Sequence, residues 1–141
     1  MLFMKQRVLF LCTGNSARSQ MAEGLLRHLA EDQYEVSSAG THPVGLNPGA
    51  VAAMQELQID ISAQQSKRMD EFLDQAFDYV ITVCDRAKES CPRWPQTGRL
   101  VHWSFEDPAA VMQSPEEQRM AFRRVRDQIR QRLEEFITAP W

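Results

Sequence analysis

The sequence predicts an α/β fold in which a four-stranded parallel sheet carries helices on both of its faces. Short apolar segments alternate with segments of helical periodicity along the 141 residues, which is typical of strand–helix–strand units. The segment Phe77–Val83 is continuously apolar at its end, as expected for a strand that is buried on both faces. No linker, repeat or low-complexity segment interrupts the chain, so we expect one catalytic domain over residues 1–141.

The first half of the chain is expected to form two strands and two helices. A strand at residues 7–11 precedes a helix from about Ala17 to Ala30, whose apolar residues recur at helical spacing. A second strand at residues 34–38 leads into a loop that contains prolines and glycines. Asn47 is the expected N-cap of a helix over residues 48–57, because proline suits the first helical position.

The second half is expected to add two strands and a long helix. One helical turn is expected at residues 70–73, the third strand at 77–83 and the fourth at 99–103. Ser114, followed by proline and then glutamate, is a typical helix start with a capping box. That helix runs to about Thr138, and its expected inner face is formed by Ala121, Val125, Ile129, Leu133 and Phe136.

Composition limits the classes of function. With 16 basic and 19 acidic residues the formal net charge is −3, which argues against nucleic acid or an anionic membrane as the main partner. No apolar run approaches the ~20 residues of a membrane span, and the first residues lack a signal-peptide pattern. Three cysteines without an export signal favour reactive thiols over a disulfide framework. We expect a cytoplasmic monomer without a metal or other cofactor.

An apolar strand, a loop of small and polar residues, and a helix start follow one another at residues 8–19. Successive N–H groups of such a loop form a nest for an oxyanion, and the helix N-terminus adds its positive dipole end. Gly14 and Asn15 best tolerate the positive φ that a nest requires, and Arg18 can donate to two oxygens of one anion. The residues expected to bind the anion are Thr13, Gly14, Asn15, Ser16, Ala17, Arg18 and Ser19.

Cys12 lies in this loop and is the expected nucleophile. A free thiol has a pKa of about 8.5 and is mostly protonated at neutral pH. We expect the helix N-terminus and Arg18 to lower the pKa of Cys12 to about 6, and the hydroxyl of Ser19 to favour the thiolate by a hydrogen bond. The alternative is that Cys12 is a small buried hydrophobic residue at a strand end.

Residues 12–24, Cys-Thr-Gly-Asn-Ser-Ala-Arg-Ser-Gln-Met-Ala-Glu-Gly, resemble the loop shared by low-molecular-weight protein tyrosine phosphatases and the arsenate reductases built on the same fold. The resemblance extends over essentially the whole chain. It implies a low-molecular-weight phosphatase-like fold with strand order 2-1-3-4. The loop is specific for this superfamily, but it does not choose between phosphatase and reductase.

Cys84 and Cys91 bear on that choice. If the first and third strands are neighbours, Cys12 and Cys84 lie at adjacent carboxyl ends of the sheet. Strand spacing then separates them by about 5 Å, to which an offset along the strands is added. In a regular helix Cys91 would be about 10.5 Å from Cys84, beyond the roughly 7 Å that a disulfide allows, so a bond between them requires the segment to unwind. The spacing Cys-x6-Cys-Pro resembles the redox segment of thioredoxin-coupled arsenate reductases.

Two other interpretations of the cysteines are weaker. Cys84 could be a core residue with Cys91 incidental to function. A zinc site is disfavoured because the spacing of the cysteines and histidines, His28, His42 and His102, fits no common zinc pattern.

Asp107 precedes a proline just after the fourth expected strand. In the family that the chain resembles, an Asp-Pro at this place supplies the general acid, which implies this role for Asp107, with Glu106 as the competitor. A turn-forming aspartate is the alternative. The phosphatases follow the pair with aromatic residues that grip a phosphotyrosine ring, whereas residues 109–111 here are Ala-Ala-Val. This difference favours a small inorganic oxyanion.

Asn15, Glu23 and Ser38 are expected to support the loop from behind. Some relatives hold a monovalent cation in this region with the help of an acidic residue. The chain offers Lys67 there instead, which argues against a cation site.

These features together imply an arsenate reductase for arsenic detoxification. Cys12 would attack arsenate, Cys84 and then Cys91 would resolve the product, and thioredoxin would reduce the final disulfide. Glutathione with glutaredoxin is an alternative electron donor. A phosphomonoester hydrolase of the low-molecular-weight phosphatase type, needing only Cys12, Arg18 and Asp107, is the alternative function, and weak phosphatase activity is expected in either case. An oxyanion-binding module without catalysis is a third interpretation.

Overall fold

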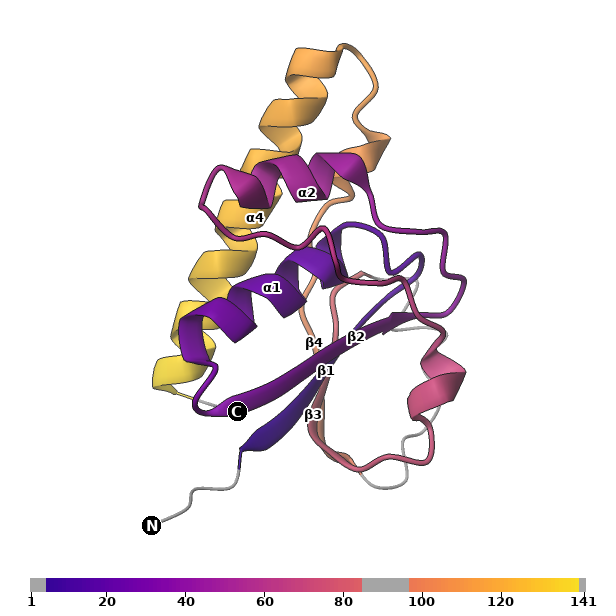
Figure 1. Ribbon diagram of the computed structural model, residues 1–141, viewed down its shortest axis with the longest axis vertical. Coiled ribbons are helices and arrows are strands. Elements are labelled where there is room, and N and C mark those ends of the chain that lie inside the picture. Colours follow the sequence, from indigo (N-terminus) through magenta and orange to yellow (C-terminus); the bar gives the residue numbers. More distant parts are fainter. Residues whose placement is uncertain (1–4, 85–96, 140–141) are drawn as a thin grey trace.

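The computed structural model describes residues 5–84 and 97–139. Its four strands are parallel and lie in the order β2-β1-β3-β4, so the predicted sheet and strand order are confirmed (Figure 1). The strands are β1 (Gln6–Cys12), β2 (Tyr34–Gly40), β3 (Phe77–Thr82) and β4 (Thr97–His102). β1 occupies the centre of the sheet, and its residues 8–11 are fully buried, as expected for a parallel strand covered on both faces.

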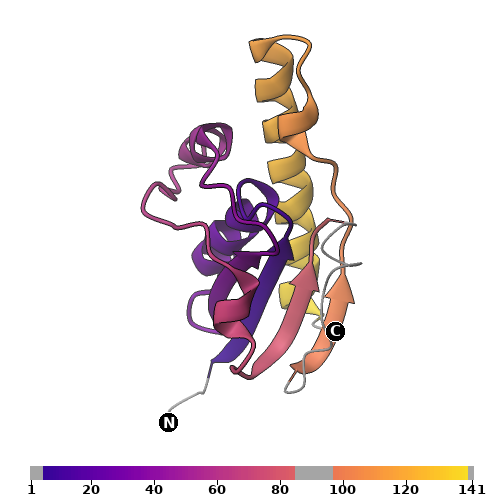
Figure 2. The same cartoon turned by 90° about the vertical axis from the view of Figure 1, so that its right-hand side faces the viewer.

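Helices α1 (Arg18–Ala30) and α4 (Pro115–Thr138) cover one face of the sheet, and α2 (Pro48–Gln55) packs against both of these helices (Figure 1). The 3-10 helix η1 (Met69–Phe72) lies on the opposite side of the sheet (Figures 1 and 2). Helices were expected on both faces, and within the described residues only η1 represents them on the second face. None of the helices described is both long and apolar enough to cross a membrane.

The two predicted helix caps are confirmed. The side chain of Asn47 accepts a hydrogen bond from the Gly49 N–H (2.7 Å) at the start of α2, and Ser114 Oγ accepts one from the Glu117 N–H (3.0 Å) at the start of α4. α2 ends at Gln55 rather than Leu57, because the chain then turns and Gln58 adopts a positive φ of 61°. These ends follow local sequence signals, which is why the sequence predicts them within a few residues.

The core joins the sheet to α4. The ring of Phe136 packs against Tyr34, Tyr79 and Trp103, with centroid distances of 5.4, 5.0 and 5.7 Å. All the residues predicted for the inner face of this helix are buried. Arg126 is also buried, and its Nη1 donates to Ala53 O and to Glu56 Oε1 (2.8 Å each), which ties α2 to α4.

β1 and β3 end side by side at the carboxyl edge of the sheet. Their register pairs Leu11 with Thr82, and the Val83 N–H continues the pairing by donating to Leu11 O (2.9 Å). Cys12, the last residue of β1, and Cys84, two residues beyond β3, therefore lie at adjacent strand ends, as the sequence predicted. In open parallel sheets, this edge is where ligands bind.

Candidate active site

The loop between β1 and α1 is held from behind through its backbone carbonyl groups. Amide groups of the segment after β2 donate to four of them: Thr41 to Cys12 (3.3 Å), His42 to Thr13 (2.8 Å), Val44 to Gly14 (3.0 Å) and Asn47 to Ser16 (3.0 Å). Because N–H and C=O point in opposite directions in a planar trans peptide, outward carbonyl groups direct the intervening N–H groups toward the concave side of the loop. The loop thus has the arrangement of an anion-binding nest.

Asn15 is the centre of this support. It has a φ of 46°, and its fully buried side chain donates from Nδ2 to Ser19 Oγ (2.8 Å) and to Ser38 Oγ (2.9 Å). Its Oδ1 accepts from the Lys67 N–H (2.8 Å). Of the two residues expected to supply a positive φ, only Asn15 does so; Gly14 does not. Ser19 Oγ accepts this bond and keeps its O–H as a donor, so the expected hydrogen bond from Ser19 to the Cys12 thiolate stays a prediction.

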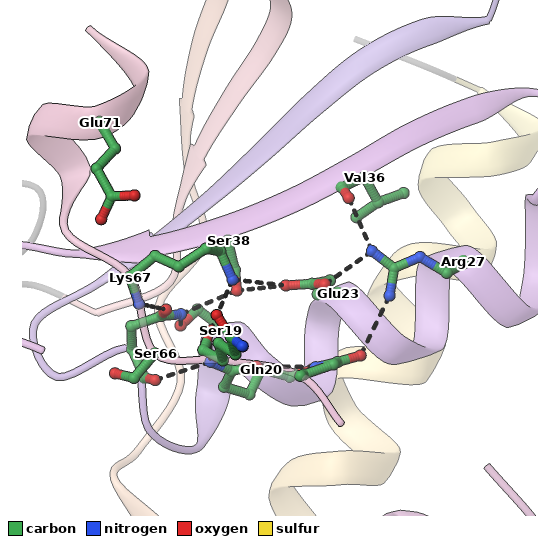
Figure 3. A network of polar contacts seen from close by, with 12 residues as sticks. Ser19, Gln20, Glu23, Arg27, Val36, Ser38, Ser66, Lys67 and Glu71 are labelled. Atoms are coloured by element: carbon green, nitrogen blue, oxygen red, sulfur yellow. Dashed lines mark hydrogen bonds and ion pairs between the residues drawn. The ribbon is translucent and has the colours of Figure 1, made fainter. Parts of the chain in front are cut away.

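A buried carboxylate continues the network away from the cavity (Figure 3). The hydroxyl of Ser38 donates to Glu23 Oε1 (2.6 Å), and Arg27 Nη2 donates to Glu23 Oε2 (2.7 Å). Lys67 Nζ lies 3.8 Å from Glu23 Oε1. Two cationic side chains therefore share the carboxylate, and the ammonium group of Lys67 lies in the region where the sequence predicted it.

Gly40 and Gln20 are supporting residues that the sequence did not identify. A Cβ on Gly40 would lie 2.7 Å from Thr13 O and 2.9 Å from the Asn15 nitrogen, so only glycine lets the end of β2 pass this close to the loop. Gln20 Nε2 donates to Asn15 O (3.0 Å) and to Gln65 O (2.9 Å). A glycine at a strand end was the available signal for Gly40; Gln20 has no comparable signal.

One cavity of about 660 Å³ opens in front of the loop, and Cys12, Thr13, Arg18, Cys84 and Asp107 all line it. The structure thus brings together four of the five predicted catalytic residues. The fifth, Cys91, lies outside the described residues. Within those residues, no group of histidine, cysteine or acidic side chains is arranged to hold a metal ion.

Arg18 bridges the loop and the segment after β4. Its Nη1 donates to Phe105 O (3.0 Å), and its Nη2 lies 3.9 Å from Asp107 Oδ2. Asp107 is about half exposed, and its Oδ1 accepts from the Ala109 N–H (3.0 Å). A carboxyl group in this place faces the anion site while keeping access to water, as a general acid requires.

Glu106, the competing acid, is held by another partner. Arg124 Nε donates to Glu106 Oε1 (2.6 Å), and this hydrogen bond holds the pKa of Glu106 below its ordinary value. A lowered pKa makes Glu106 a poorer proton donor near neutral pH. The geometry therefore favours Asp107 over Glu106.

Cys12 and Cys84 are both buried and not bonded to each other as a disulfide. The hydrogen bond between the two thiols and burial raise the pKa of Cys12, although the charge of Arg18 and the Gly14 N–H lower it. The predicted lowering of the Cys12 pKa is therefore wrong for this arrangement. The sequence identifies the groups that favour a thiolate and places Cys84 at the neighbouring strand end, but it does not predict the effect of that second thiol on the Cys12 pKa. Thr13 Oγ1 also lies 3.4 Å from Cys84 Sγ.

Fold and site together define a class of α/β proteins in which a cysteine lies in an anion-binding loop between the first strand and the first helix. The chain belongs to the low molecular weight phosphotyrosine protein phosphatase family, whose model matches residues 7–139.

Relatives within this family show closer similarity. The chain is 48% identical over 132 residues to an arsenate reductase of Halalkalibacterium halodurans, covering 94% of this chain and 95% of that protein. A solved arsenate reductase in a phosphate-binding state superposes with a TM-score of 0.80 at 37% identity, covering 94% of this chain and 97% of that one. A thioredoxin-dependent arsenate reductase of Corynebacterium glutamicum gives a TM-score of 0.76 at 28% identity, over 99% of this chain and 63% of that one.

Proposed function

We propose that this protein is an arsenate reductase that converts arsenate to arsenite through Cys12, Cys84 and Cys91, and that thioredoxin reduces the resulting disulfide. The observation that carries the proposal is that Cys12 and Cys84 lie at the ends of the paired strands β1 and β3 and line the same cavity. A hydrolase needs only the first of these sulfur atoms. The arsenate reductase relatives support the substrate, and the thioredoxin-dependent relative supports the electron donor.

Arsenate enters the nest with its oxygens toward the N–H groups of the loop and the guanidinium of Arg18. Its binding requires Arg18 to exchange its contact with Phe105 O for the anion, since one planar guanidinium can then donate to two oxygens. Displacement of Cys84 from Cys12 removes the largest cause of the raised pKa of Cys12. The charge of Arg18 and the Gly14 N–H then favour the thiolate that attacks.

The first step forms a bond between Cys12 sulfur and arsenic and breaks one arsenic–oxygen bond. Asp107 gives its proton to the departing oxygen, which leaves as water rather than hydroxide. In the second step Cys84 attacks the Cys12 sulfur, so that a disulfide forms, the sulfur–arsenic bond breaks and arsenite leaves with the electron pair. Cys91 then attacks Cys84 and Cys12 is released as a thiolate.

The alternative function is a phosphomonoester hydrolase, and the family to which the chain belongs supports it. Cys12, Arg18 and Asp107 suffice for that reaction, and phosphate matches arsenate in shape and charge. We therefore expect weak phosphatase activity beside the reductase activity. Residues 109–111, which carry no aromatic side chain to grip an aryl group, favour the inorganic substrate.

Arsenate-dependent oxidation of reduced thioredoxin, measured for Cys84→Ser and Cys91→Ser, tests the proposal. Both variants should lose turnover, while hydrolysis of p-nitrophenyl phosphate stays within about twofold of the unmodified protein. Cys12→Ser is the matched control and should lose both activities. Full arsenate turnover in Cys84→Ser and Cys91→Ser would contradict the relay and favour the hydrolase. Replacing thioredoxin by glutathione with glutaredoxin identifies the donor.

A further inference from the structure

The walls of the cavity differ in character from its floor. The loop between β1 and α1 forms the floor, where its N–H groups and Arg18 can bind three oxygens of a tetrahedral anion. The walls come mainly from the segments after β2 and β4 and include the apolar side chains of Val44, Phe105 and Ala109. A nucleophile on the floor displaces the ligand on the opposite side of the central atom. The leaving atom of the anion therefore lies between these walls.

Contacts with the rest of the molecule hold these apolar side chains in place. The Val44 N–H donates to Gly14 O (3.0 Å), and the residue is 75% exposed where it borders the cavity. Phe105 and Ala109 are partly buried against the hydrophobic core. Apolar groups offer no hydrogen bond to a departing oxygen, but they suit a leaving atom that is larger and less strongly hydrated.

Most polar side chains that the described residues place on these walls are engaged elsewhere. Asn47 Oδ1 accepts from the Gly49 N–H (2.7 Å), and Glu106 Oε1 accepts from Arg124 Nε (2.6 Å). A departing oxygen therefore depends on Asp107 for its proton, because hydroxide is the conjugate base of a very weak acid and leaves slowly without one. Hydrogensulfide is the conjugate base of a much stronger acid, so sulfur departs readily without that proton.

We propose that this cavity also reduces monothioarsenate, in which sulfur replaces one arsenate oxygen, and that the reaction does not need the proton of Asp107. Three oxygens bind at the floor and the sulfur lies between the apolar walls, since a cavity of about 660 Å³ has room for this larger atom. The Cys12 thiolate forms a sulfur–arsenic bond while the arsenic–sulfide bond breaks. The electron pair of that bond leaves on hydrogensulfide, together with the proton that the substrate dianion carries.

The later steps rest on the proposed function, because the adduct on Cys12 is the same one that arsenate gives. Cys84 attacks the Cys12 sulfur, a disulfide forms, and arsenite leaves with the electron pair of the sulfur–arsenic bond. In sum, two thiols and one monothioarsenate give one disulfide, one arsenite and one hydrogensulfide. The first step needs neither Cys84 nor Cys91, so it can be measured separately from the relay.

The test compares monothioarsenate with arsenate in the unmodified protein and in Asp107→Asn, with reduced thioredoxin as the electron donor at neutral pH. With monothioarsenate, the unmodified protein should release one sulfide for each thioredoxin oxidised, which excludes turnover of contaminating arsenate. Asp107→Asn should lower kcat for arsenate by ~10²-fold, but kcat for monothioarsenate by less than about threefold. Equal losses with the two substrates, or oxidation of thioredoxin without release of sulfide, would overturn the proposal.

Two companion measurements complete the experiment. Without thioredoxin, Cys84→Ser should release a burst of one equivalent of sulfide from monothioarsenate, whereas Cys12→Ser should release none above the rate in buffer. Val44→Ser, which makes the wall polar, should raise the ratio of KM for monothioarsenate to KM for arsenate severalfold. Arsenate turnover in the unmodified protein with no sulfide burst in Cys84→Ser would overturn this inference and leave the proposed function standing. A burst without arsenate turnover would overturn the proposed function, and the reduction of monothioarsenate with it.

Discussion

The loop between β1 and α1 has a back, which packs against β2, and a front, which faces the cavity. The two sides differ in how many of their polar groups have hydrogen-bond partners within the protein. Behind the loop, Asn15, Ser38 and Glu23 are buried and joined by hydrogen bonds of 2.6–2.9 Å. In front of it, Arg18 Nη2 is 3.9 Å from Asp107 Oδ2, and that carboxylate is half exposed. The back therefore fixes the shape of the nest, whereas the front keeps donors and an acid whose contacts a substrate can replace. Variants on the two sides should separate stability from activity.

The largest effect should come from Arg18→Lys at the front. Lysine keeps the positive charge but loses the planar pair of donors, and loss of an oxyanion donor costs ~10²–10³-fold in rate. We expect kcat/KM for arsenate to fall by about 10³-fold, while the free energy of unfolding changes by less than about 1 kcal/mol. Steady-state kinetics and urea denaturation measure the two quantities. If the free energy of unfolding fell by as much as the transition-state free energy lost in kcat/KM, the division between a structural back and a catalytic front would be contradicted.

Asp107→Asn should have the next largest effect, because the amide cannot supply a proton. We expect kcat for arsenate to fall by ~10²-fold, with a smaller change in KM. Glu106→Gln is the matched control on the same segment, and it should change kcat less than about threefold, since Glu106 is engaged by Arg124. Equal losses in the two variants would reassign the acid.

These two carboxylates illustrate what the sequence can predict. The Asp-Pro pair and its place after a strand selected Asp107 by resemblance, and the caps Asn47 and Ser114 follow from local patterns. The sequence left Glu106 as a competitor, because its partner Arg124 is 18 residues away on α4. Side-chain pairs between distant elements are set by packing and carry no local signal.

The loop shows the same limit. Asn15 has the predicted positive φ, because tolerance of this conformation is a property of the asparagine residue itself and can be predicted without the rest of the fold. The donors that turn the loop carbonyls outward come instead from backbone groups at residues 41–47, which no residue type encodes. The pKa of Cys12 was predicted with the wrong sign for a related reason: its main cause is the hydrogen bond from Cys84, placed by the register of β1 and β3.

Ser38→Ala should weaken the back of the loop. It leaves Glu23 Oε1 without its 2.6 Å donor and Asn15 Nδ2 without one of its two acceptors. A buried polar group without a partner costs about 1–3 kcal/mol, so we expect the free energy of unfolding to fall by that amount and KM for arsenate to rise severalfold. Ser37→Ala, the neighbouring residue of β2, is the control and should change stability by less than about 0.5 kcal/mol. If both variants behave alike, the network does not support the nest.

The smallest expected effect concerns the ionisation of Cys12. Its pKa is raised chiefly by the hydrogen bond with Cys84, so the thiolate fraction at neutral pH is low and grows as the pH rises past the ordinary thiol value of about 8.5. Removing the partner thiol in Cys84→Ala should lower the pKa of Cys12, and at pH 7 iodoacetamide should therefore alkylate Cys12 severalfold faster. Cys91→Ser should leave the rate unchanged. A slower reaction in Cys84→Ala would mean that the Cys84 thiol donates to a Cys12 thiolate at rest, and the front of the loop would then be charged before any substrate arrives.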